Sequence, residues 1–165
     1  MIASPIGLRA AVGDDRPALI DLLRRSWLRT WAPELPFDAV RLFVEQDPVT
    51  GYVETHLPGF SVAIRAQSIV GVLHIVGDTI ESIEVDPRAA RSGIGTVLLA
   101  HGEDQIARSH DQGRLEVRAF NRDALAFYRH HGWIEMARYT ASECGAQVET
   151  IALVKAVVRR DPANR

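Results

Sequence analysis

The residues best suited to chemistry lie in a strand-like run that carries two carboxylates, Glu81 and Glu84. Asp86 and Pro87 end this run, because proline removes a donor from the hydrogen-bond ladder of a sheet. Strict alternation along a strand places Glu81 on the same face as Ile83 and Val85, and Glu84 on the opposite face. Either carboxylate could serve as a general base, with Glu81 slightly favoured, or could be a solvated charge paired with an arginine.

The turn after this strand is suited to hold a phosphate group. Gly93 and Gly95 open a helical pattern, and a helix N-terminus presents unpaired backbone N–H groups and a favourable dipole to an anion. On the two glycines alone, an ordinary strand-to-helix turn explains the segment equally well. Charged and hydroxyl side chains that could assist an anion are Arg88, Arg91, Ser92 and Thr96.

Two common nucleotide-binding loops do not fit this turn. A Walker loop needs a lysine after its last glycine, and the only lysine of the chain is Lys155. A dinucleotide-binding fingerprint needs a third small residue where Leu98 stands, and it belongs to the first βα unit rather than to mid-chain. A coenzyme A cradle remains.

A second block supports this interpretation. It reads Asn121-Arg-Asp-Ala124-Leu-Ala-Phe127-Tyr128-Arg-His-His-Gly132-Trp133. Together with the glycine turn, it resembles the GNAT superfamily of N-acetyltransferases over nearly the whole chain. The family usually carries Gln or Arg where Ala90 stands, and Arg91 could supply that charge.

The resemblance implies an α/β fold with a central mixed sheet, whose fourth and fifth strands are parallel and splayed around acetyl-CoA. It implies that Tyr128 protonates the leaving thiolate as a general acid, although an apolar helix face beside Phe127 also suits a core tyrosine. The residues that it implies at the coenzyme site are Ile83, Glu84, Val85, Arg88, Arg91, Ser92, Gly93, Ile94, Gly95, Thr96, Asn121, Ala124, Phe127 and Tyr128.

Hydrophobic spacing supplies the elements that position these residues. It predicts a first strand, a helix with Leu19, Leu22, Leu23 and Trp27, a short helix near Phe43, and a loop over 51–59. Strands follow over 60–65, 69–76 and 79–85, then a helix, a strand over 115–119, a helix over 121–131, and strands over 133–140 and 148–157. We therefore expect one domain over residues 1–158 and a frayed tail over 159–165.

The acceptor amine is less well defined. The resemblance places Trp27 and Trp31 near the acceptor site, although core packing explains them equally well. Between Trp31 and Phe60, five residues are acidic and only Arg41 is basic. This excess of negative charge suggests a cationic acceptor such as a small amine, polyamine, amino sugar or basic peptide end. A solvated acidic surface would explain it as well. These acidic residues are Glu34, Asp38, Glu45, Asp47 and Glu54.

Composition narrows the other possibilities. A net charge of -2 lacks the electrostatic footprint of a nucleic-acid-binding protein, and no apolar run is long enough for a membrane span. The single cysteine, Cys144, rules out an internal disulfide, and we expect no metal site. We expect a soluble cytoplasmic enzyme, and the resemblance suggests a homodimer through the last strands. The alternative is a non-catalytic acetyl-CoA sensor or partner module.

Overall fold

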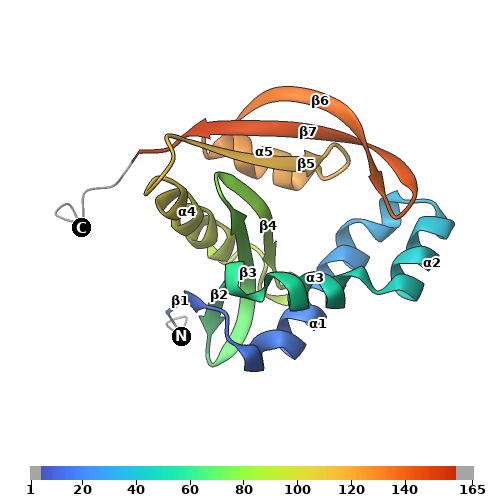
Figure 1. Cartoon of the computed structure of the whole chain (residues 1–165), viewed down its shortest axis with the longest axis horizontal. Coiled ribbons are helices and arrows are strands. Elements are labelled where there is room, and N and C mark those ends of the chain that lie inside the picture. Colours follow the sequence, from blue (N-terminus) through green and yellow to red (C-terminus); the bar gives the residue numbers. More distant parts are fainter. Residues whose placement is uncertain (1–4, 159–165) are drawn as a thin grey trace.

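The computed structural model describes residues 5–158 of the chain, so the predicted tail over 159–165 lies outside the described residues. Its frame is a seven-stranded sheet with the order β1-β2-β3-β4-β5-β7-β6 (Figure 1). The strands are β1 (Gly7–Ala10), β2 (Phe60–Arg65), β3 (Ser68–Val76), β4 (Thr79–Val85), β5 (Gln112–Arg118), β6 (Ile134–Glu143) and β7 (Ala146–Ala156). The main helices are α1 (Arg16–Thr30), α2 (Phe37–Gln46), α3 (Pro48–His56), α4 (Ile94–Ile106) and α5 (Arg122–His130). The predicted α/β class with a mixed sheet is confirmed.

Each face of the sheet has its own hydrophobic core. On one face, α4 and α5 bury the apolar residues predicted from their spacing, among them Leu98, Leu99 and Ile106, against β3, β4, β5 and β7. On the other face, α1, α2 and α3 pack their apolar residues on β2 and β3. The two cores hold β4 between two helical layers, so both faces of this strand are supported.

Strands β4 and β5 are parallel and splayed, as predicted. Their pairing consists of Thr79 with Arg114 and Ile80 with Leu115. Beyond Ile80, β4 keeps its antiparallel partner β3 but has no register with β5. Backbone groups on this edge of β4 are therefore left for another partner.

The prediction of a loop over 51–59 is wrong, because residues 48–56 form helix α3. Pro48 occupies the first turn, where its missing N–H costs nothing. Val49, Val53 and Leu57 then recur every four residues and are buried in the core under α1. This burial outweighs the roughly 1 kcal/mol that a mid-helix glycine such as Gly51 costs.

The last hairpin is also longer than predicted. Strand β6 continues to Glu143 and β7 begins at Ala146, so the turn consists of Cys144 and Gly145, both with positive φ. Two consecutive left-handed residues form the tight turn that matches strand twist. The extension carries Glu143 to the far end of the sheet, where the hairpin tip lies beside α2 (Figure 1).

Candidate active site

A cleft opens where β4 and β5 separate. Its volume is about 280 Å³. Besides β5 and Trp31, the cleft is lined by several residues that the sequence assigned to the site, namely Glu81, Ile83, Glu84, Asn121, Ala124 and Tyr128. Asn121 also caps α5, because its side-chain oxygen accepts a hydrogen bond from the backbone N–H of Ala124 at 3.2 Å. The structure thus brings β4 and the block from Asn121 to Trp133 to one cleft.

The predicted anion-binding turn lies at the start of α4. Gly93, with a φ of 81°, precedes the first helical residue, Ile94. A Cβ atom on Gly95 would lie 3.5 Å from the ring of Phe127, an ordinary van der Waals contact, so Gly95 faces α5. The Ser92 hydroxyl donates to the carbonyl oxygen of Ala89 at 2.5 Å, which closes the turn. The first N–H groups of α4 have no partner within the helix and remain available to an anion.

The other assigned residues at this turn lie around the helix start without lining the cleft. A Cβ atom on Gly95 would lie 3.8 Å from a methyl group of Val85. The hydroxyl of Thr96 lies 3.5 Å from Nε2 of His131. Arg91 has a φ of 59° and follows Ala90, which is exposed.

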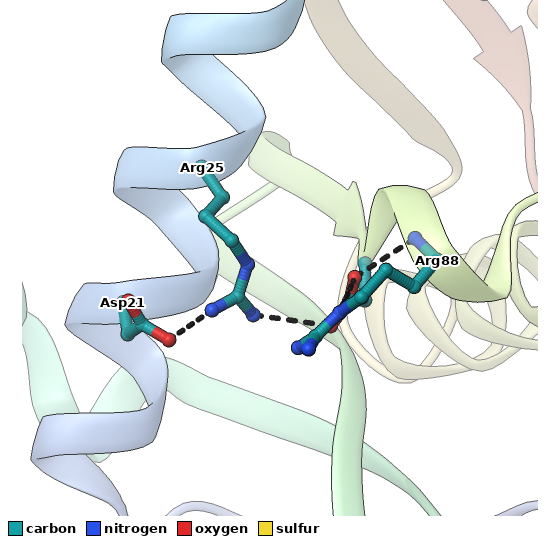
Figure 2. A network of polar contacts seen from close by, with 4 residues as sticks. Asp21, Arg25 and Arg88 are labelled. Atoms are coloured by element: carbon teal, nitrogen blue, oxygen red, sulfur yellow. Dashed lines mark hydrogen bonds and ion pairs between the residues drawn. The ribbon is translucent and has the colours of Figure 1, made fainter.

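Arg88 is already engaged by a carboxylate, Asp86 (Figure 2). Asp86 accepts hydrogen bonds from the backbone N–H and the guanidinium of Arg88, each at 2.9 Å, and from Arg25 of α1 at 3.0 Å. Arg25 also pairs with Asp21. The hydrogen bonds from Arg88, aided by the charge of Arg25, lower the pKa of Asp86 to about 2. This network ties α1 to the segment that leads into the anion-binding turn.

A second cavity, of about 640 Å³, adjoins the cleft and shares Trp31, Glu81, Ser82 and Glu84 with it. Helices α1, α2 and α3 form most of its wall. The two cavities therefore adjoin along β4.

The predicted separation of Glu81 and Glu84 onto opposite faces of the strand is wrong. His74 pairs with Ser82 whereas Ile75 pairs with Ile80, so Glu81 has no partner on β3. This β-bulge breaks the alternation and re-aims the side chains that precede it. Both glutamates consequently line the second cavity.

Glu84 and Tyr128 have environments that suit proton transfer. Glu84 accepts a hydrogen bond from the Ser26 hydroxyl, and burial raises the pKa of Glu84. Burial and, secondarily, the charge of Glu84 raise the pKa of Tyr128, so its hydroxyl stays protonated near neutral pH. A carboxylate with a raised pKa and a protonated phenol therefore meet the same cleft.

Trp27 and Trp31 both line the second cavity. Trp27 stacks on Phe43 with a centroid separation of 3.6 Å, and its indole N–H donates to Glu143 at 3.1 Å. The Arg118 guanidinium lies 5.4 Å from the ring centre of Trp31. Both tryptophans therefore pack against neighbouring side chains and also line the cavity.

Sequence reasoning missed Tyr52, whereas it interpreted His74 as a core or cleft side chain, and His74 is indeed buried. The Tyr52 hydroxyl lies 2.5 Å from Nδ1 of His74, and Tyr52 lines the second cavity. Burial lowers the pKa of His74, and the neighbouring His56 lowers it further. The spacing of Val49, Val53 and Leu57 was the available signal for a helix that carries Tyr52.

The acidic segment that suggested a cationic acceptor points elsewhere. Asp38 and Glu45 pair with Arg41, and Asp47 pairs with Arg24. Within residues 5–158, neither cavity is lined by any acidic residue of this segment. The carboxylates that do line the second cavity are Glu81, Glu84 and Glu143.

Two further structural findings concern residues 5–158. They contain no group of three or more histidine, cysteine or acidic residues arranged to hold a metal ion. Among their helices, none combines the length and apolar character needed to cross a membrane.

Solved structures of acetyltransferases share this fold. A GCN5-related N-acetyltransferase from Rhodopseudomonas palustris superposes with a TM-score of 0.81 at 19% identity, covering 95% of this chain and 99% of that chain. The PaiA N-acetyltransferase from Thermoplasma acidophilum, solved with coenzyme A, has a TM-score of 0.76 at 18% identity, with 92% and 99% covered. A GNAT acetyltransferase from Bacillus cereus has a TM-score of 0.71 at 14% identity, with 94% and 99% covered.

These similarities establish the fold, whereas the family rests on the sequence itself. No curated protein matches the chain. Residues 16–133, which span both sequence blocks and β4, match the acetyltransferase (GNAT) family. The chain therefore belongs to the acetyltransferase (GNAT) family.

Proposed function

We propose that this protein transfers the acetyl group of acetyl-CoA to a primary amine by direct attack within a ternary complex. The observation that carries the proposal is the separation of β4 from β5 beyond Ile80, with a cleft between the strands and a second cavity that adjoins it along β4. Two substrates can thereby reach the same stretch of β4 from opposite sides.

The described residues fit a coenzyme A donor. The free edge of β4 at Ile83 and Glu84 offers backbone groups to an amide-containing arm, and the start of α4 offers N–H groups to a pyrophosphate. Bound acetyl-CoA would supply the activated acyl group. N–H groups fixed on β4 would stabilise the charge that develops on the carbonyl oxygen.

The attacking amine must be neutral, although an alkyl ammonium has a pKa of about 10.4 in water. Glu84 suits the role of base, because its raised pKa brings it closer to the pH at which the enzyme operates. Glu81 lies on the same cavity and is the second candidate. The sequence slightly favoured Glu81, whereas the contact with Ser26 and the raised pKa support Glu84.

Tyr128 suits the role of general acid. It lines the cleft and remains protonated, so it can donate to a leaving thiolate. A non-catalytic acetyl-CoA sensor would require neither this tyrosine nor the glutamates.

Calorimetric titration with acetyl-CoA, followed by measurement of coenzyme A release with added amines, tests the proposal. Binding with a Kd near 1 µM, about -8 kcal/mol, and amine-dependent release are expected. Binding without release for any amine would support the sensor instead. An absence of binding at millimolar acetyl-CoA would overturn both.

A further inference from the structure

From the second cavity we infer the class of acceptor: a small primary amine that carries one positive charge and an apolar, ring-sized body. This inference rests on the proposed function and narrows it. It favours such an amine over a polyamine, an amino sugar or a basic peptide end, each of which the sequence left open.

The part of the cavity wall that the helices supply is largely apolar and aromatic. Leu23 and Trp27 come from α1, Phe43 from α2, and Val49 and Tyr52 from α3. Trp27 and Phe43 stack face to face, with ring planes within 2° of parallel and centroids 3.6 Å apart, so the pair forms a rigid aromatic part of the wall. An apolar body gains binding energy against such a wall, because contact removes apolar surface from water.

The charge of the cavity favours a single ammonium group. Its lining contains Glu81, Glu84 and Glu143 but no lysine or arginine. Glu143 is already balanced by Arg118 at 3.4 Å, and Ser26 donates a hydrogen bond to Glu84. Neither Glu81 nor Glu84 has an ion-pair partner within residues 5–158. Because Glu84 is assigned to proton transfer, Glu81 is the carboxylate left to attract an ammonium group, and the aromatic faces add to this attraction.

The tip of the β6–β7 hairpin closes one side of the cavity. Glu143 accepts the indole N–H of Trp27 at 3.1 Å. Cys144 packs against the core under α1, α2 and α3, and a Cβ atom on Gly145 would lie 3.6 Å from a methyl group of Leu42 on α2. These contacts hold the hairpin tip against the helices, so the cavity has a fixed wall on this side.

A matched pair of amines tests the apolar requirement. 2-Phenylethylamine and ethanolamine both present a primary amine on a two-carbon chain, but only the first carries a ring. Burial of a ring predicts a kcat/KM about 100-fold higher for 2-phenylethylamine. Spermidine, glucosamine and a peptide with a free N-terminus complete the panel, and a higher kcat/KM for any of them would overturn the inference while leaving acetyl transfer intact.

Binding of 2-phenylethylamine by calorimetry gives a readout that does not need turnover. Glu81→Gln should weaken this binding about tenfold, as expected for loss of one charge near an ammonium group. Glu54→Gln is the matched control, because Glu54 is exposed on α3 and outside the cavity. Equal affinity in all three proteins, or no amine binding at millimolar concentration, would overturn the inference even if acetyl-CoA binds. If 2-phenylethylamine binds but no amine is acetylated, the proposed function fails and the class of ligand stands.

Discussion

Glu81 and Glu84 line the same cavity, although they are three residues apart on one strand and strict alternation would separate them. The β-bulge opposite His74 and Ile75 brings them together. Bulges next to functional sites commonly re-aim a side chain in this way. The two glutamates suit different roles. Glu84, which accepts a hydrogen bond from Ser26, suits proton transfer, and Glu81 suits attraction of a cation.

Replacement of Glu84 by glutamine should remove the proton acceptor while keeping a side chain of nearly the same size at that position. Glu84→Gln is expected to lower kcat roughly 100-fold. In the unchanged enzyme, activity should rise with pH as Glu84 loses its proton, with a midpoint above the ordinary value of 4.5 because its pKa is raised. The pH profile of kcat/KM for both proteins checks this expectation. A midpoint that persists unchanged in Glu84→Gln would assign the base to another group.

Tyr128→Phe should separate catalysis from binding. Loss of the hydroxyl removes the proton donor for the thiolate, so kcat should fall roughly 100-fold, while the Kd for acetyl-CoA stays within about twofold. Steady-state kinetics and calorimetry on the same preparation measure both. Full activity in Tyr128→Phe would show that Tyr128 serves only the packing of α5, where it is buried.

Asp86 should contribute a stability that depends on pH. Its pKa is about 2 in the folded protein against an ordinary 3.8. The folded state therefore binds this proton less readily, and the stabilisation is complete above pH 4 and lost as the pH falls toward 2. The difference corresponds to roughly 2 kcal/mol at neutral pH.

Urea unfolding of the unchanged protein and Asp86→Asn checks this prediction. The gap in unfolding free energy should be widest near pH 7 and should shrink below pH 4. Asp38→Asn is the control, because the Asp38 side chain is 82% exposed. A gap that stays constant with pH would contradict the role given to the contacts of Asp86 with Arg25 and Arg88.

Replacement of Gly59 and of Gly51 by alanine should change the stability of the protein in opposite directions. A Cβ atom on Gly59 would lie 2.8 Å from the ring of His74, which its contact with Tyr52 holds in place, so Gly59→Ala should lose about 1–3 kcal/mol. Gly51 has nothing within 4 Å of that position and lies inside α3, so Gly51→Ala should gain up to about 1 kcal/mol. Thermal unfolding of both variants measures the signs. Destabilisation by Gly51→Ala would contradict the placement of α3.

Much of the fold could be predicted because its signals are local. Alternating strands, the glycines before α4 and the block from Asn121 to Trp133 each specify a short element. Their order then allows few topologies, since a parallel crossover has a fixed hand. The splay between β4 and β5 followed from the family resemblance rather than from the strands themselves.

The acceptor side could not be predicted to the same extent, because it depends on contacts between distant segments. The bulge at Glu81 depends on how β4 pairs with β3 on either side of it, and no nearby residue type indicates the bulge in the sequence. The presence of Gly51 indicated a loop rather than a helix. Val49 and Val53 nevertheless stabilise helix α3, because both are buried in the core. Glu143 reaches Trp27 from a position 116 residues later in the chain, which spacing along the sequence cannot reveal.

The most direct test of the account is the rate of coenzyme A release from acetyl-CoA, measured with and without 2-phenylethylamine, together with the intact mass of the protein after each incubation. Direct attack predicts release that depends on the amine, an acetylated amine in equal amount, and a protein of unchanged mass. Binding of acetyl-CoA without amine-dependent release, or a protein that accumulates an acetyl group before the amine is added, would contradict the account.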